Sequence, residues 1–258
     1  MERFLPLPVP DVAPAAWVVE RMPAFTGVVA DLVPGPFAAH ARVFHRPDGG
    51  RSYEGSITPG SWAAVAEAAR TTFHPTAQWS DLAGPLERTT AALTPHLSID
   101  SPALGSLDRV SFPALAEVLA RHTTTPDPWW LALWVGCGDL PPGWDGAATF
   151  HTPGRQHWLF RASAATLQAH AVAFEAAGWA DDDTSLRHRL AYGNLRSPQL
   201  WWPEDRAWAV ASEIDHDSTI VAGTHALVAD LLVTPGLECL RISPRDSLMA
   251  GADRVNAL

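Results

Sequence analysis

The chain has 258 residues, of which 28 are acidic and 18 are basic, so its formal net charge at pH 7 is −10. Hydrophobic residues make up 47% of the sequence and charged residues 18%, which excludes an intrinsically disordered chain, and no apolar run is long enough for a transmembrane helix. All 18 basic residues are arginine, and the absence of lysine excludes P-loop nucleotide binding, pyridoxal phosphate chemistry, lysine-dependent aldolases and protein kinases.

The charge balance and the N-terminal sequence also bear on partners and location. Nucleic acid is not an expected partner, because a phosphate backbone requires a basic face that scattered arginines do not build. Residues 1–6 show no apolar segment followed by a small-residue cleavage site, so no signal peptide is expected. Cys137 and Cys239 lack C-x-x-C spacing, which argues against a thiolate zinc site and a disulfide framework. We therefore expect a cytoplasmic protein without membrane contact or cofactor.

The first half of the chain predicts a proline-rich arm, one strand and three helices. Residues 1–36 contain seven prolines, each of which removes a backbone donor, so this segment is expected to be an N-terminal arm that docks partly on the body. Alternating residues predict a strand over 39–45. Ser61 is the expected N-cap of a helix that ends at Ala69. Two further helices are expected over 84–93 and 111–122.

The second half predicts most of the sheet. Strands are expected over the apolar run 129–135 and over 156–162, a helix over 164–174 and an exposed acidic loop over 179–183. The C-terminal third is expected to form a loop (197–205), a strand (207–215), a helix (219–232) and a short strand (237–242). Strands separated by mixed helices and loops favour an α+β fold. We therefore expect one domain over residues 37–258, with a mostly antiparallel or mixed sheet and packed helices.

Three carboxylates follow the strand predicted at 207–215. Alternate residues of a strand share a face, so Glu213, Asp215 and Asp217 are expected to project together. Like charges at that separation raise one another's pKa or require a cation, which suggests a divalent-metal site or an acid/base pair. The structural alternative has Asp217 capping the helix expected at 219, Asp215 ending the strand, and Glu213 paired with Arg206 or Arg161. This alternative is favoured, because Asp before a helix is commonly a cap and no metal-binding motif is present.

Tryptophans form the second candidate group. Clustered tryptophans serve both cores and binding platforms, and a core role is favoured for the group as a whole. Because proline-flanked loops seldom lie wholly inside a core, Trp201 and Trp202 are expected at the edge of a concavity and partly exposed. The expected binding cleft joins this loop to the carboxylate corner. Its candidate residues are Trp201, Trp202, Glu204, Asp205, Arg206, Trp208, Glu213, Asp215, Asp217 and Ser218.

The same segments carry a family resemblance. The run from Trp201 to Trp208 (WWPEDRAW) and the run from Glu213 to Thr219 (EIDHDST) resemble a family of uncharacterised actinobacterial proteins. The composition, rich in arginine, alanine and proline, agrees with a GC-rich genome, and the resemblance covers residues 39–246. Supporting segments are 122–126, 129–140 and 155–160.

No activity is implied by this resemblance. The family pattern has Cys at position 209 and an aromatic residue at position 220, whereas this chain has Ala209 and Ile220, which weakens any role for these two residues. The sequence thus predicts a non-enzymatic binding or interaction protein, with a protein or small-molecule partner. An immunity-like role is a further hypothesis that rests on the acidic net charge alone. The alternative function is a metal-dependent hydrolase that uses Glu213, Asp215 and Asp217.

Overall fold

The computed structural model describes residues 7–47, 60–93, 100–108, 110–137, 144, 146–167 and 197–257. At its centre lies one antiparallel sheet. Its eight strands follow the order β3-β4-β2-β5-β6-β7-β1-β8, and every pair of neighbours runs antiparallel. The fold is therefore a single-domain α+β fold, as predicted. The strands are β1 (Ala39–Phe44), β2 (Trp129–Trp134), β3 (Thr149–Thr152), β4 (Arg155–Ala162), β5 (Leu200–Pro203), β6 (Ala209–Ala211), β7 (Ser218–Gly223) and β8 (Cys239–Ile242).

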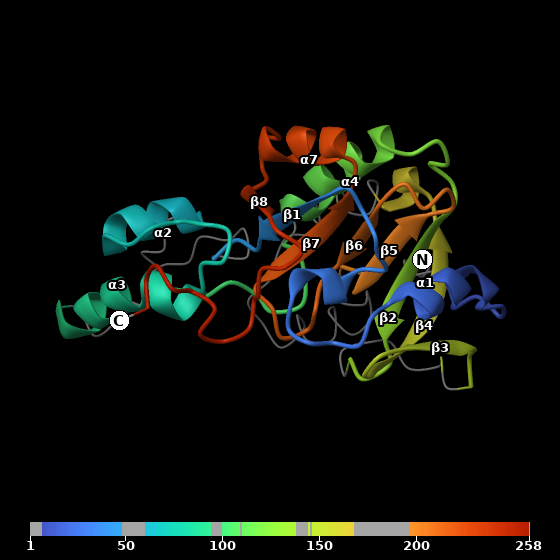
Figure 1. The fold of residues 1–258 in the computed structure, drawn as a ribbon, viewed down its shortest axis with the longest axis horizontal. Coiled ribbons are helices and arrows are strands. Elements are labelled where there is room, and N and C mark those ends of the chain that lie inside the picture. The colour runs from blue at the N-terminus through green and yellow to red at the C-terminus, as the bar shows by residue number, and fades with distance from the viewer. Residues whose placement is uncertain are drawn as a thin grey trace, which may run out of the picture.

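One face of the sheet is covered by two helices, α4 (Ser111–Arg121) and α7 (His225–Leu232), which lie side by side (Figure 1). Leu115, Val118 and Leu119 are buried here, as the helical spacing predicts. The inward residues of the strands supply large aromatic rings to the same core, including Trp129, Trp201 and Trp208. Pro113 lies in the first turn of α4, where its missing N–H costs least.

The opposite face is covered by the N-terminal arm, which contains η1 (Ala13–Ala15), α1 (Ala16–Arg21) and η2 (Val29–Leu32). Trp17, Val18 and Val29 are buried against apolar strand residues. Trp202 meets Trp17 edge to face on this side, with 5.9 Å between the ring centroids. Successive residues Trp201 and Trp202 of β5 thus fill the two opposite cores, as strand alternation requires.

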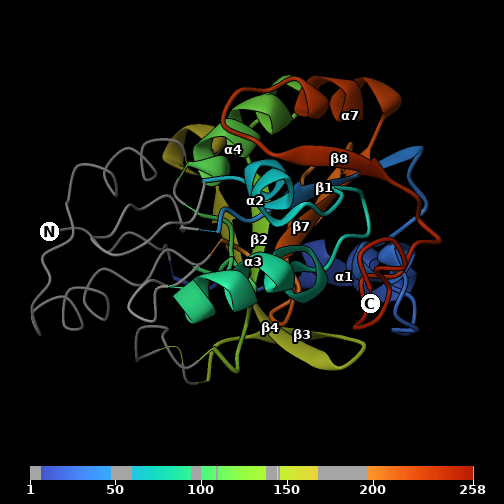
Figure 2. The ribbon, with the colours of Figure 1, turned by 90° about the vertical axis from the view of Figure 1, so that its left-hand side faces the viewer.

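A third, smaller core lies beyond β1, where α2 (Trp62–Ala69) and α3 (Trp79–Leu93) pack together (Figure 2). Ser61 Oγ accepts a hydrogen bond from Ala64 N at 3.2 Å, so its predicted role as N-cap is confirmed. Helix α3 begins at Trp79, five residues before the predicted start at 84. In the part of the chain that the structure describes, no helix is long and apolar enough to cross a membrane.

The C-terminal third differs from its prediction. The expected loop 197–205 contains β5, the expected strand 207–215 is ordered as a strand only over β6, and the expected helix 219–232 divides into β7 and α7. The β-branched run Thr219-Ile220-Val221 favours a strand and overrides the helical spacing of its apolar residues. Residues 164–167 are helical, but the rest of the helix predicted over 164–174 and the loop predicted over 179–183 lie outside the described residues.

Because of this division, the N-cap of α7 is Thr224 and not Asp217. Thr224 Oγ1 accepts a hydrogen bond from Leu227 N at 3.1 Å. We expect Thr224→Ala to lower the free energy of unfolding by about 1 kcal/mol, the usual loss for an N-cap. Urea unfolding measures this loss, and Thr224→Ser, which keeps the acceptor, should restore most of it. Equal stability of Thr224→Ala and the wild type would contradict this assignment.

Candidate functional site

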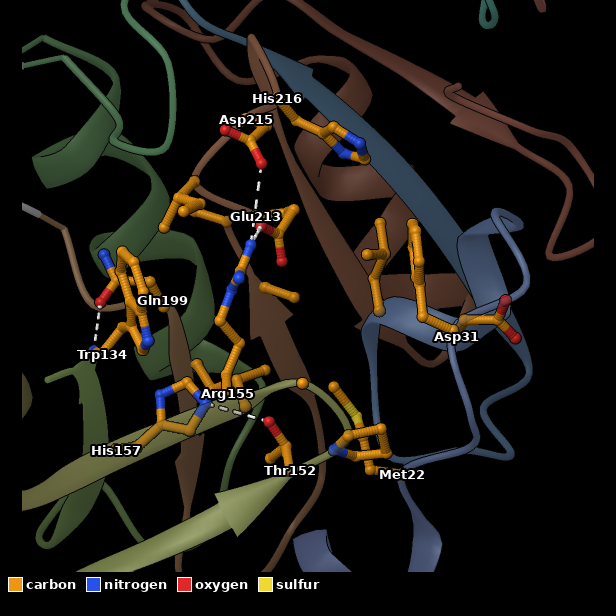
Figure 3. Close-up of a pocket in the computed structure, with 18 of the residues that line it drawn as sticks. Met22, Asp31, Trp134, Thr152, Arg155, His157, Gln199, Glu213, Asp215 and His216 are labelled. Atoms are coloured by element: carbon orange, nitrogen blue, oxygen red, sulfur yellow. Dashed lines mark hydrogen bonds and ion pairs between the residues drawn. The ribbon is translucent and has the colours of Figure 1, made fainter. Parts of the chain in front are cut away.

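A cleft of about 280 Å³ opens at one end of the sheet, between the strand ends and the N-terminal arm. The antiparallel register brings the last residue of β2, the first residues of β4 and β5 and the end of β6 to this point. Polar side chains gather here, while the middle of the sheet is apolar. The lining includes Met22, Phe25, Asp31, Trp134, Thr152, Arg155, His157, Gln199, Glu213, Asp215, His216 and Met249 (Figure 3).

Arg155 is the charged centre of the cleft. Its Nη2 donates to Glu213 Oε1 at 2.5 Å and lies 3.7 Å from Asp215 Oδ2, and its guanidinium carbon lies 4.9 Å from the centroid of a Trp134 ring. The two carboxylates reach it from the turn after β6, which is closed by a hydrogen bond from His216 N to Glu213 O. Figure 3 shows the Arg155 side chain extending from β4 toward both carboxylates. An arginine therefore supplies the positive charge that these acids need.

His157 follows Arg155 on the same face of β4 and is 3% exposed. Its Nε2 lies 3.0 Å from Thr152 Oγ1, and its ring stacks on Phe150. Burial, reinforced by the charge of Arg155, lowers the pKa of His157 to about 4, so the ring is neutral near pH 7. Among the described residues, neither His157 Nδ1 nor Arg155 Nε has a hydrogen-bond partner, although both atoms are buried.

The opposite wall of the cleft comes from the arm and the C-terminal segment. Phe25 and Met249 form an apolar rim there and are 48% and 45% exposed. Asp31 supports the arm, because its carboxylate accepts hydrogen bonds from Thr26 N, Thr26 Oγ1 and Val28 N. Burial alone raises the pKa of Asp31, but these hydrogen bonds outweigh it and lower the pKa below its ordinary value. Asp31 therefore stays ionised.

Comparison with known proteins gives no further guide to this cleft. No protein-family model, curated protein or solved structure matches the chain. The resemblance to an actinobacterial family stays a prediction, and the function has to be argued from the geometry of the site.

The three predicted carboxylates do not converge. Glu213 and Asp215 share Arg155, whereas Asp217 pairs with Arg42, with 2.9 Å between Asp217 Oδ1 and Arg42 Nη2. Ser218, also a predicted site residue, accepts a hydrogen bond from Arg42 Nε outside the cleft lining. Within the described ranges, no three His, Cys, Asp or Glu side chains are grouped to hold a metal ion. Two arginines thus pair with the three acids that the sequence suggested as metal ligands.

The prediction that Trp201, Trp202 and Trp208 line the binding cleft is wrong. Trp201 and Trp202 are 0% and 1% exposed, and Trp208 is also buried, because β5 lies between β2 and β6 inside the sheet. The strands β5 and β6 form a hairpin, so residues 204–206 lie at the opposite end from Glu213. The polar residues of that turn are structural: Glu204 accepts from Trp130 Nε1, Asp205 accepts from Thr123 and Thr124, and Arg206 lies over a Trp17 ring.

The sequence reasoning missed Arg155, His157 and the contribution of the arm. The predicted partners of Glu213 were Arg206 and Arg161, but Arg161 lies 3.9 Å from Asp127. The sequence does contain a signal for His157. In the strand predicted over 156–162, this polar residue shares a face with the buried Leu159. A polar residue on an inward strand face indicates either a satisfied network or a site.

Proposed function

We propose that this protein is a binding protein whose ligand site is the cleft around Arg155 and His157. We also propose that it acts in the cytoplasm, as the sequence analysis expects. The observation that carries the proposal is a pair of nitrogens, Arg155 Nε and His157 Nδ1, which are buried on one face of β4 and have no hydrogen-bond partner in the part of the chain that the structure describes. A buried polar group without a partner costs about 1–3 kcal/mol. Both N–H groups are closed off from solvent, so a ligand oxygen accepts from Arg155 Nε–H, and also from His157 Nδ1–H once Nε2 accepts from the Thr152 hydroxyl, only after neighbouring side chains of the cleft move aside.

Binding is favoured over covalent catalysis by the state of Ser212, a hydroxyl of the cleft lining, and of His45, to which it is linked. Ser212 Oγ lies 2.7 Å from Thr219 Oγ1, which lies 2.9 Å from His45 Nε2. His45 Nδ1 donates to Ala103 O, so Nε2 must accept from Thr219, and Thr219 must accept from Ser212. Ser212 and His45 are both buried, and burial lowers the pKa of His45. This chain of hydrogen bonds is closed within the core and offers no exposed nucleophile.

A fragment screen tests the proposal. Small polar fragments are screened against the full chain by saturation-transfer NMR, and hits are located by the ¹H–¹⁵N shifts of cleft residues. We expect hits that shift Trp134 and Arg155 and that are lost in Arg155→Met and in His157→Phe, which keeps a ring against Phe150. Arg161→Met changes an exposed arginine of the same strand and should leave the hits unchanged. Hits that survive both cleft substitutions, or an absence of hits in the cleft, would contradict the proposal.

A further inference from the structure

The charge of the cleft restricts what it can bind. Among the described lining residues, Arg155 is the one cation, whereas Asp31, Glu213 and Asp215 are anions, so the lining carries a formal charge of −2. The two histidines add no charge near pH 7, because burial lowers the pKa of both His157 and His216. A free anion would therefore be repelled, in spite of the arginine.

Glu213 and Asp215 differ in how closely they contact Arg155 and in how exposed they are. Glu213 makes the short contact with Arg155, and its side chain is 24% exposed. Asp215 is 78% exposed and reaches Arg155 only at 3.7 Å, so most of its hydrogen-bonding capacity faces solvent at the cleft. An ammonium group is the natural partner of such a carboxylate. Asp215 can accept it without breaking the ion pair between Arg155 and Glu213.

From these features, and resting on the proposed function, we infer that the ligand is a small organic amine that also carries an oxygen acceptor and an apolar group. The ammonium group lies at Asp215, and the oxygen accepts from Arg155 Nε and His157 Nδ1 once the side chains that close off these two nitrogens move aside. The apolar group lies on the exposed side chains of Phe25 and Met249. A cavity of about 280 Å³ is slightly smaller than the pockets of drug-sized ligands, which suits a molecule the size of an amino acid amide.

Four related probes separate these contributions. Phenylalanine amide has all three groups, 3-phenylpropionamide lacks the amine, phenethylamine lacks the carbonyl, and N-acetylphenylalanine is an anion. Isothermal titration of the full chain should give the tightest binding for phenylalanine amide, with each of the other probes weaker by roughly tenfold or more. Asp215→Asn should weaken phenylalanine amide and leave 3-phenylpropionamide unchanged. Arg161→Met should change neither affinity.

The outcomes distinguish this inference from the proposed function. Equal or tighter binding of 3-phenylpropionamide or N-acetylphenylalanine in the cleft would overturn the amine inference while the binding function stands. Binding of phenylalanine amide that Asp215→Asn leaves unchanged would also overturn it, as would a lack of binding by all four probes. The proposed function itself fails only if the fragment screen also finds no ligand that depends on Arg155 and His157.

Discussion

Replacing Arg42 with methionine is expected to lower the free energy of unfolding by about 3–5 kcal/mol, because the change leaves a buried charge unpaired. Arg42 lies on β1 and is 1% exposed. Its Nε donates to Ser218 Oγ at 2.8 Å, and its Nη2 donates to Asp217 Oδ1 at 2.9 Å. Its Nη1 donates to the backbone oxygens of Pro75 and Ala77 at 3.0 and 2.7 Å. One guanidinium thus joins β1, β7 and the segment before α3.

Urea unfolding followed by circular dichroism measures the effect of this substitution. Arg161→Met serves as the control, since Arg161 is exposed and its ion pair spans 3.9 Å, and we expect it to change stability by less than about 0.5 kcal/mol. The double variant Arg42→Met/Asp217→Asn should lose less stability than the sum of the two single variants, because it removes both partners of the pair. A loss below about 1 kcal/mol for Arg42→Met would show that water replaces these contacts.

A comparable loss, about 3–5 kcal/mol, is expected for Trp201→Ala, which opens a cavity in the core between the sheet and α4. The Trp201 ring stacks on Phe112 with 5.5 Å between centroids and lies 5.9 Å from both Trp129 and Trp208. None of these neighbours can fill the space without leaving its own packing site. Trp130→Ala should cost much less, since Trp130 is only partly buried on the neighbouring strand.

Fluorescence provides an independent check of the same claim. The part of the fluorescence that acrylamide quenches readily should be the same in Trp201→Phe as in the wild type, because no part of the Trp201 side chain is exposed. Ready quenching of Trp201, together with a small loss of stability in Trp201→Ala, would return this residue to the exposed cleft that the sequence suggests.

The elements that the sequence predicts well are those whose signals are local. The strands at 39, 129 and 156 follow from alternation or from short apolar runs, and the helix after Ser61 follows from its cap. The errors occur where a local signal competes with the tertiary structure. Pro203 indicates a loop, yet it ends a buried strand, where its missing N–H is tolerated. The helix predicted after Ser218 forms only from His225 onward, because the residues before His225 pair with β1 and β6.

The candidate site is predictable only in part for a related reason. Glu213 and Asp215 do come together at Arg155, but they do so in the turn after β6 and not through the strand alternation on which the prediction rests. Which arginine neutralises them depends on the register of β4 beside β2, and the second wall comes from the arm, more than a hundred residues away in the sequence. No periodicity in a single sequence records such long-range pairings. The fate of Asp217 is decided likewise by Arg42, a residue of a different strand.

The ¹⁵N chemical shifts of the His157 imidazole test the central claim most directly. The signals are assigned by their loss in His157→Phe, and they are followed during titration with a cleft ligand from the fragment screen. We expect the Nδ1 signal to shift as this nitrogen gains its first hydrogen bond, while Nε2 keeps its partner in Thr152. An Nδ1 signal that does not move when the ligand is saturating would contradict the proposal that the cleft binds its ligand through His157.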